Sequence, residues 1–157
     1  MKKIFIMLVS LIVVSGCTTP AMTVDATRDL HLKTAEVCTD LTVEMAKDRL
    51  KKAWENCYLG QGPSETMIVT GSTVMIVPVY GGGSSMSVEM EKNESGYSLA
   101  LRNFKQEIYL MADIASAEEC ESKIIARGWN FAWDRAAQYT EKWIENPDAP
   151  GPFAVCR

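Results

Sequence analysis

Apolar side chains recur at a helical period in two separate parts of the chain. In residues 40–58 the apolar positions are spaced i, i+4, i+7, i+8, i+11 and i+12 from Ala46, and charged side chains fill the opposite face. In residues 130–145 a second apolar stripe is formed by Trp133, Ala136, Ala137, Thr140, Trp143 and Ile144. Helix-ending residues, Gly60 and Pro147, follow the two segments. The pattern predicts two amphipathic helices.

Between these segments the period changes to two, which is typical of strands with one buried face. Residues 67–70 and 73–80 are joined by Gly71-Ser72, a suitable hairpin turn, and Pro78 indicates an edge position or a bulge. Further alternating runs occupy residues 85–91, 97–102 and 107–113. Residues 117–127 are ambiguous: Ser116 with Glu119 resembles a helix-capping box, but the apolar run before Gly128 favours a last strand.

Together these elements predict an α+β fold made of a helix, an antiparallel β-meander of about five strands, and a second helix. Short turns separate the predicted strands, so neighbours in sequence are expected to pair. Each helix has one apolar stripe, and we expect both helices to pack on one face of the sheet.

The first residues of the chain do not belong to this pattern. Met1-Lys2-Lys3 is basic, residues 4–14 are almost entirely apolar, and the small residues Ser15 and Gly16 follow. This order is typical of a secretory signal peptide. The apolar run is too short to span a bilayer, which needs roughly 20 residues in a helix.

The end of this segment, Val14-Ser15-Gly16-Cys17, resembles the lipobox of bacterial lipoproteins. The resemblance implies that the signal is removed before Cys17, and that Cys17 carries a diacylglyceryl thioether and an amide-linked acyl chain such as palmitate. Thr18, where an aspartate would favour the inner membrane, implies the outer membrane with the domain facing the periplasm. The alternative is an ordinary cleaved signal peptide followed by an incidental cysteine. The predicted α+β arrangement is also similar to that of small periplasmic lipoproteins of unassigned function.

These features divide the chain into a signal peptide at residues 1–16, a lipidated N-terminus and tether at 17–36, and a single α+β domain at 37–157. The tether is predicted because the segment after Cys17 contains Pro20 and scattered threonines without a period. Loss of Lys2 and Lys3 from the 16 basic residues leaves 14 against 20 acidic ones, so the formal charge changes from −4 to −6. An acidic chain argues against nucleic-acid binding and assigns membrane attachment to the acyl chains.

Four cysteines remain if Cys17 is lipidated, and an even number in an exported chain indicates two disulfides. They are Cys38, Cys57, Cys120 and Cys156. A Cys38–Cys57 bond is the least expected, because the predicted helix between them would hold them about 28 Å apart. We favour Cys57–Cys156 with Cys38–Cys120. Metal binding by these cysteines is a weaker alternative, since none has C-x-x-C spacing.

The remaining residues offer little catalytic chemistry. His31 is the single histidine and lies in the predicted tether, away from fixed neighbours. Asp113, Glu118 and Glu119 could act as a carboxylate pair, but we expect them on the surface. Four methionines could bind Cu(I): Met75, Met86, Met90 and Met111. The four tryptophans could bind a ligand: Trp54, Trp129, Trp133 and Trp143. For both sets, packing in the core is the expected role. We therefore expect no catalytic residue, metal or cofactor.

These observations favour a lipid-anchored, periplasm-facing envelope protein with a non-enzymatic role, such as scaffolding or contact with an envelope protein partner. The alternative is a ligand-binding module, for example one that holds a wall fragment or inhibits a lytic enzyme. Its candidate surface is the glycine-rich segment that contains Tyr80, Gly82 and Ser84. This segment lacks the lysine and following helix of a phosphate-binding loop. An envelope hydrolase is the third hypothesis.

Overall fold

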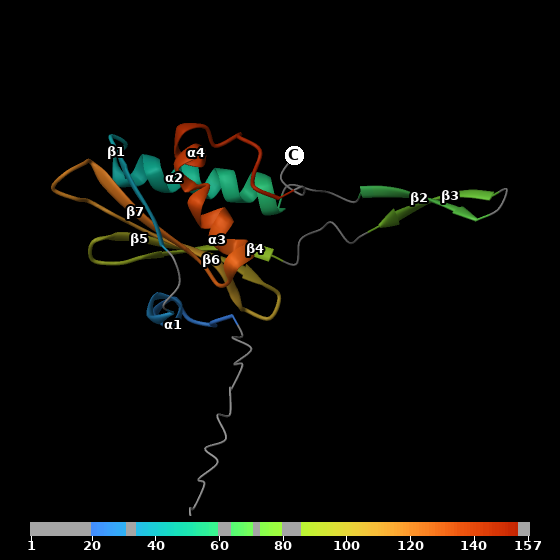
Figure 1. Cartoon of the computed structure of the whole chain (residues 1–157), viewed down its shortest axis with the longest axis horizontal. Coiled ribbons are helices and arrows are strands. Elements are labelled where there is room, and N and C mark those ends of the chain that lie inside the picture. Colours follow the sequence, from blue (N-terminus) through green and yellow to red (C-terminus); the bar gives the residue numbers. More distant parts are fainter. Residues whose placement is uncertain (1–19, 31–33, 60–63, 71–72, 80–85, 154–157) are drawn as a thin grey trace, which may run out of the picture.

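Five antiparallel strands form the central sheet of the computed structural model, which describes residues 20–30, 34–59, 64–70, 73–79 and 86–153. They are β1 (Thr34–Thr39), β4 (Met86–Lys92), β5 (Gly96–Asn103), β6 (Ile108–Ala115) and β7 (Ser122–Gly128), in the order β1-β7-β6-β5-β4 (Figure 1). Every neighbouring pair in this sheet is antiparallel. The predicted α+β fold is confirmed, and β7 shows that the ambiguous segment 117–127 contains the last strand.

Three helices cover one face of this sheet (Figure 1). They are α2 (Val43–Trp54), which continues in a π-helical turn (Glu55–Leu59), α3 (Phe131–Gln138) and α4 (Thr140–Glu145). Alternation along the strands directs Leu99, Leu110 and Ile124 toward these helices, and all three side chains are fully buried. The core between the layers also contains Ala46, Leu50, Ala53, Trp54, Leu101, Ala126, Ala137, Trp143 and Ile144.

The second predicted helix is divided into α3 and α4 at Tyr139. Its start is as the sequence suggests, because the Asn130 side chain accepts hydrogen bonds from the backbone amides of Ala132 and Trp133. At Tyr139 the backbone amide bonds to carbonyls three and two residues earlier, which tightens the turn and ends α3. The division lets α3 pack on β7, β6 and β1, while α4 packs on α2 and β1. The first half of the apolar stripe is thereby buried mainly against the sheet, and the second half mainly against α2.

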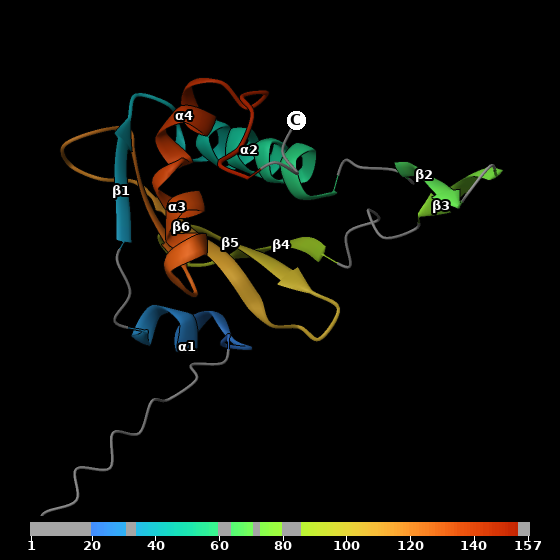
Figure 2. The same cartoon turned by 45° about the vertical axis from the view of Figure 1, so that its right-hand side comes forward.

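The opposite face of the sheet carries a fourth helix, α1 (Val24–Asp29), which lies in the segment predicted as a tether (Figure 2). Thr23 begins it by accepting a hydrogen bond from the amide of Ala26 (3.2 Å), and Val24 packs against the small buried cluster that includes Met111. Residues 34–36 likewise belong to β1, which pairs with β7. The tether prediction for 17–36 is therefore wrong for these residues. Its error has a physical cause, since a six-residue helix is too short to show a period.

The predicted hairpin forms a sheet of its own. β2 (Ser64–Thr70) and β3 (Thr73–Val79) pair antiparallel with each other, and Pro78 stands opposite Glu65. Among the described residues, neither strand of the hairpin pairs with a strand of the five-stranded sheet. β1 completes the five-stranded sheet instead, so the expectation of one continuous meander beginning at residue 66 is corrected.

Candidate functional site

A group of hydrogen-bonded polar side chains lies beneath α1, on the sheet face opposite the other three helices. Successive residues of a strand point to opposite faces, so Ser98 and Asp113 point away from the core that contains Leu99. The register of β5 and β6 places Ser98 directly opposite Asp113. Arg127 of β7 reaches the same position from the next strand, and α1 supplies Arg28.

The Asp113 carboxylate accepts hydrogen bonds from three side chains. Arg28 donates to both carboxylate oxygens, through Nη2 (2.7 Å) and Nε (3.1 Å), in a bidentate arrangement. Arg127 Nη1 donates to Oδ2 (3.0 Å), and Ser98 Oγ donates to Oδ1 (2.8 Å). The Asp113 side chain is 21% exposed. This network joins α1 to three elements distant in sequence and fixes the helix on the sheet.

The electrostatics of this group keep Asp113 charged. Burial raises the pKa of Asp113, but the hydrogen bonds from Arg28 and Ser98 and the charges of Arg28 and Arg127 together lower it by more. The pKa of Asp113 therefore lies below its ordinary value. A general acid at neutral pH requires a raised pKa, so this carboxylate is suited to holding α1 rather than to donating a proton.

Replacing Asp113 with asparagine is expected to lower the free energy of unfolding at pH 7 by about 2 kcal/mol, because two arginines lose the charged partner of their hydrogen bonds. A group whose pKa is lowered by folding stabilises the fold above its unfolded pKa, about 3.9 for aspartate, and loses that contribution as the pH falls further. The difference between wild type and Asp113→Asn should therefore be constant from pH 5 to 7 and shrink below about pH 4. Urea unfolding at several pH values measures it.

Asp25→Asn provides the matched control for this prediction. Asp25 also pairs with Arg28 (2.6 Å), but its side chain is 86% exposed, and exposed ion pairs contribute little to stability. If Asp25→Asn lowered the free energy of unfolding as much as Asp113→Asn, the partly buried position of Asp113 would not matter. Any ion pair of Arg28 would then stabilise the docking of α1 equally well.

A cavity of about 260 Å³ lies between α1 and this polar group. It is lined by Met22, Thr23, Val24, Asp25, Arg28, Glu91, Asn93, Ser98 and Arg102. The lining carries both signs of charge, and Arg102 is already paired with Glu89 through Nε (2.6 Å). Drug-sized ligands occupy sites of about 300–1,000 Å³, so this cavity is suited to one small polar group.

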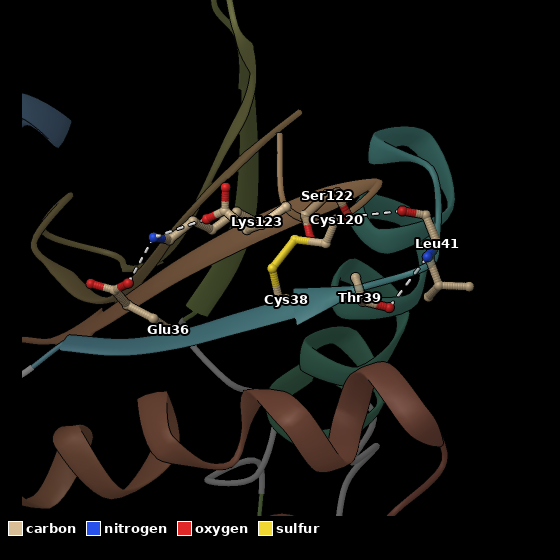
Figure 3. Close-up of a disulfide and its surroundings, with 8 residues drawn as sticks. Glu36, Cys38, Thr39, Leu41, Cys120, Ser122 and Lys123 are labelled. Carbon is tan, nitrogen blue, oxygen red and sulfur yellow. Dashed lines mark hydrogen bonds and ion pairs between the residues drawn. A yellow bond between two sulfur atoms is a disulfide. The ribbon is translucent and has the colours of Figure 1, made fainter. Parts of the chain in front are cut away.

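The structure contains the predicted disulfide between Cys38 of β1 and Cys120, whose Cα atoms are 5.8 Å apart (Figure 3). Ser122 Oγ donates a hydrogen bond to the carbonyl of Leu41 (2.9 Å) beside it. Lys123 pairs with Glu36 (2.9 Å) along the same two strands. These contacts fasten the edge strand β1 to the start of β7.

Cys57 lies buried in the π-helical turn and is also disulfide-bonded. Its predicted partner, Cys156, lies outside the described residues, so the Cys57–Cys156 pairing stays a prediction. The lipidation residue Cys17 and the candidate ligand residues Tyr80, Gly82 and Ser84 also lie outside them. The proposed ligand surface therefore stays a prediction.

The remaining candidate side chains differ in their exposure. Glu118 and Glu119 are exposed, as expected, whereas Asp113 is partly buried, so its surface assignment is wrong. Trp54, Trp143 and Met111 are fully buried, while Met90 is exposed. His31 lies outside the described residues. Within the described ranges, no group of three or more histidine, cysteine or acidic side chains is arranged to hold a metal ion.

The Arg28–Asp113 contact is the part of the site that sequence reasoning missed. The two residues are 85 positions apart, and no periodicity relates them. One signal was present: Asp113 is a charged residue on a strand face whose neighbouring position, Met111, is apolar. A charged residue in such a position is expected to have a partner.

Residues 1–18 match the family model for a prokaryotic membrane lipoprotein lipid attachment site. Comparison with curated proteins and with solved structures gave no match. The match confirms the predicted lipoprotein signal, and the chain carries the attachment site of a lipid-anchored envelope protein. Among the described residues, no helix is both long and apolar enough to cross a membrane.

Proposed function

We propose that the chain is a lipoprotein of the bacterial outer membrane, cut before Cys17, acylated on Cys17 and facing the periplasm. The lipid attachment site at residues 1–18 is the observation that carries the proposal. One acyl chain binds a bilayer only marginally, whereas two or three make release negligible. Thr18 supports the outer membrane, because the resemblance to lipoproteins associates an aspartate at that position with the inner one.

We further propose that the domain acts by contact with another envelope component rather than by catalysis. Asp113 is partly buried, and ion pairs with Arg28 and Arg127 keep its carboxylate charged. The nearby Arg102 is likewise engaged by Glu89. Paired charges of this kind stabilise a rigid surface, and rigid surfaces suit recognition because little order is lost on binding.

Replacing Cys17 with alanine tests the anchor. We expect wild type to incorporate a palmitate analogue and to sediment with the outer-membrane fraction. Cys17→Ala should lose both properties, because the thioether and the N-terminal amide are formed on this residue. Thr18→Ser is the matched control and should keep both. Thr18→Asp should stay labelled but move to the inner-membrane fraction. Unchanged labelling of Cys17→Ala would remove the proposal.

The cavity beneath α1 supports a second candidate function, the binding of a small polar ligand such as a cell-wall fragment. Asn93, Ser98 and Arg28 line this cavity, where Ser98 Oγ accepts hydrogen bonds from the other two side chains, so a bound polar group would meet an ordered polar wall. A bound ligand stabilises the folded state by mass action, so soluble wall fragments should raise the melting temperature of wild type but not of Asn93→Ala. Lysozyme is the parallel probe for an inhibitory role. No shift with either probe would exclude this candidate.

A further inference from the structure

The chain enters the domain at one end of the sheet, beside the turn between β5 and β6. The carbonyl of Ala21 accepts a hydrogen bond from the backbone amide of Ile108, the first residue of β6 (2.7 Å). The carbonyl of Met22 accepts one from Arg102 Nη1 (2.8 Å). Figure 2 shows the start of α1 and the yellow β5–β6 turn on the same side of the sheet. Residues 21 and 22 are therefore fixed to the domain and are not a flexible linker.

The short distance from Cys17 to this point restricts how the domain can sit on a membrane. Four residue steps separate Cys17 from Ala21, and extended chain covers at most about 3.6 Å per residue, so the two lie within about 14 Å of each other. A tether of residues 17–36 would have allowed several times this distance. An acylated Cys17 must therefore hold this end of the sheet close to the lipid surface.

Exposed apolar side chains gather at the same end. Of the five large apolar side chains that are exposed in the described part of the chain, three lie here: Phe104 (70% exposed), Met22 (59%) and Phe131 (75%). Phe131 begins α3 just after β7, whose last residue Gly128 stands opposite Leu110 near the start of β6. We call Met22, Phe104 and Phe131 the apolar rim.

The turn that carries Phe104 is rigid, although nothing in the described fold packs over its ring. The Asn103 side chain accepts hydrogen bonds from the amides of Lys105 (2.9 Å) and Glu107 (3.0 Å), and Gln106 adopts a positive φ of 67°. Lys105 Nζ lies 5.7 Å from the centre of the Phe104 ring. A phenylalanine ring held outward beside a lysine can enter the boundary between headgroups and acyl chains, while the lysine ammonium stays among the headgroups.

The opposite end of the sheet has the opposite character. β6 has eight residues and so runs about 23 Å from Ile108, beside the turn, to Ala115. The loop that follows carries Glu118, Glu119 and Glu121, all exposed. Anionic headgroups repel such an end, so charge and apolar surface favour the same orientation.

We propose that the apolar rim rests on the bilayer that holds the acyl chains of Cys17, so that the domain stands with its acidic loop pointing away from the membrane. This inference rests on the proposed acylation of Cys17. It names a lipid surface as the occupant of the rim, because the anchor ends within reach of it.

Photo-crosslinking of the full chain in cells tests this orientation. A benzophenone analogue of phenylalanine is placed at position 104 and, as the matched control, at position 45, where Met45 is 49% exposed at the start of α2. We expect lipid adducts at position 104 in several-fold higher yield than at position 45. Equal lipid yields, or adducts of position 104 with protein, including a second copy of the chain, would overturn the inference.

Two further measurements separate the possible failures. Palmitate-analogue labelling of each crosslinking variant reports the anchor: loss of label overturns the proposed function and with it this inference, whereas a labelled chain without lipid adducts at position 104 overturns only the orientation. In nanodiscs, the amides of residues 105–107 of acylated wild type should exchange several-fold more slowly than those of acylated Phe104→Ser. Equal exchange in two equally folded proteins would also overturn the orientation.

Discussion

Removing the Cys38–Cys120 disulfide by changing both residues to alanine is expected to lower the free energy of unfolding by about 4 kcal/mol. The bond joins residues separated by 82 positions, and closing so long a loop greatly restricts the unfolded chain. Cys38 is exposed and Cys120 only partly covered, so little packing is lost. Chemical unfolding of the double variant and wild type under oxidising conditions measures the difference.

Thr34→Ala is the control for this prediction, since Thr34 is exposed on the same edge strand and its replacement should change stability by no more than about 0.5 kcal/mol. The ion pair of Glu36 with Lys123 and the hydrogen bond from Ser122 to Leu41 remain in the double variant. A loss below about 1 kcal/mol would mean that these contacts, rather than the covalent bond, keep β1 beside β7.

Replacing Gly128 with alanine is expected to cost about 3 kcal/mol. Gly128 ends β7 where α3 approaches it most closely. An added Cβ would lie 2.1 Å from the carbonyl carbon of Trp133 and 2.3 Å from the amide nitrogen of Asp134. Both are backbone atoms, so relief requires α3 to move away from the sheet by more than about 1 Å, which weakens its contacts with β7 and β6. Thermal unfolding and the near-ultraviolet circular dichroism of the tryptophans report the change.

Gln138→Ala provides a comparison in the same helix. Gln138 is exposed at the end of α3, so its truncation should change stability by less than about 0.5 kcal/mol. If Gly128→Ala changed stability as little as Gln138→Ala, a small shift of α3 would be enough to relieve the clash with the added Cβ. The packing between β7 and α3 would then be looser than the contacts indicate.

The sequence predicted the elements whose patterns are long enough to repeat. α2, β5 and β6 have clear periods, and the strand preferred for the ambiguous residues 117–127 is present as β7. The elements that were missed, α1 and β1, have six residues each. β1 gains its position through pairing with β7, a contact between distant segments that no local pattern contains. The sequence predicted the β2–β3 hairpin but not that it forms a sheet separate from the five-stranded one.

Of the candidate functional residues, the sequence likewise predicted only those that belong to a local pattern. The lipobox is a contiguous motif, so sequence alone located Cys17 and the family comparison confirmed the signal. The group around Asp113 depends on α1 folding back onto the sheet, and on a strand register that brings Ser98 and Asp113 together. Arg28 appeared to belong to a tether because its partner lies in another part of the chain. Such contacts exist only after the chain has folded.

The order of the cysteines has a consequence for how this protein is made. Cys38 pairs with Cys120 and not with Cys57, which lies between them in sequence. A chain that crosses a membrane from its N-terminus presents Cys57 to the oxidising side well before Cys120, and oxidation in order of arrival would join Cys38 to Cys57. Thiol–disulfide exchange would then have to undo that bond, and uncatalysed exchange is slow. Biogenesis of the domain therefore depends either on Cys38 staying reduced until most of the chain has emerged or on a disulfide isomerase in the receiving compartment.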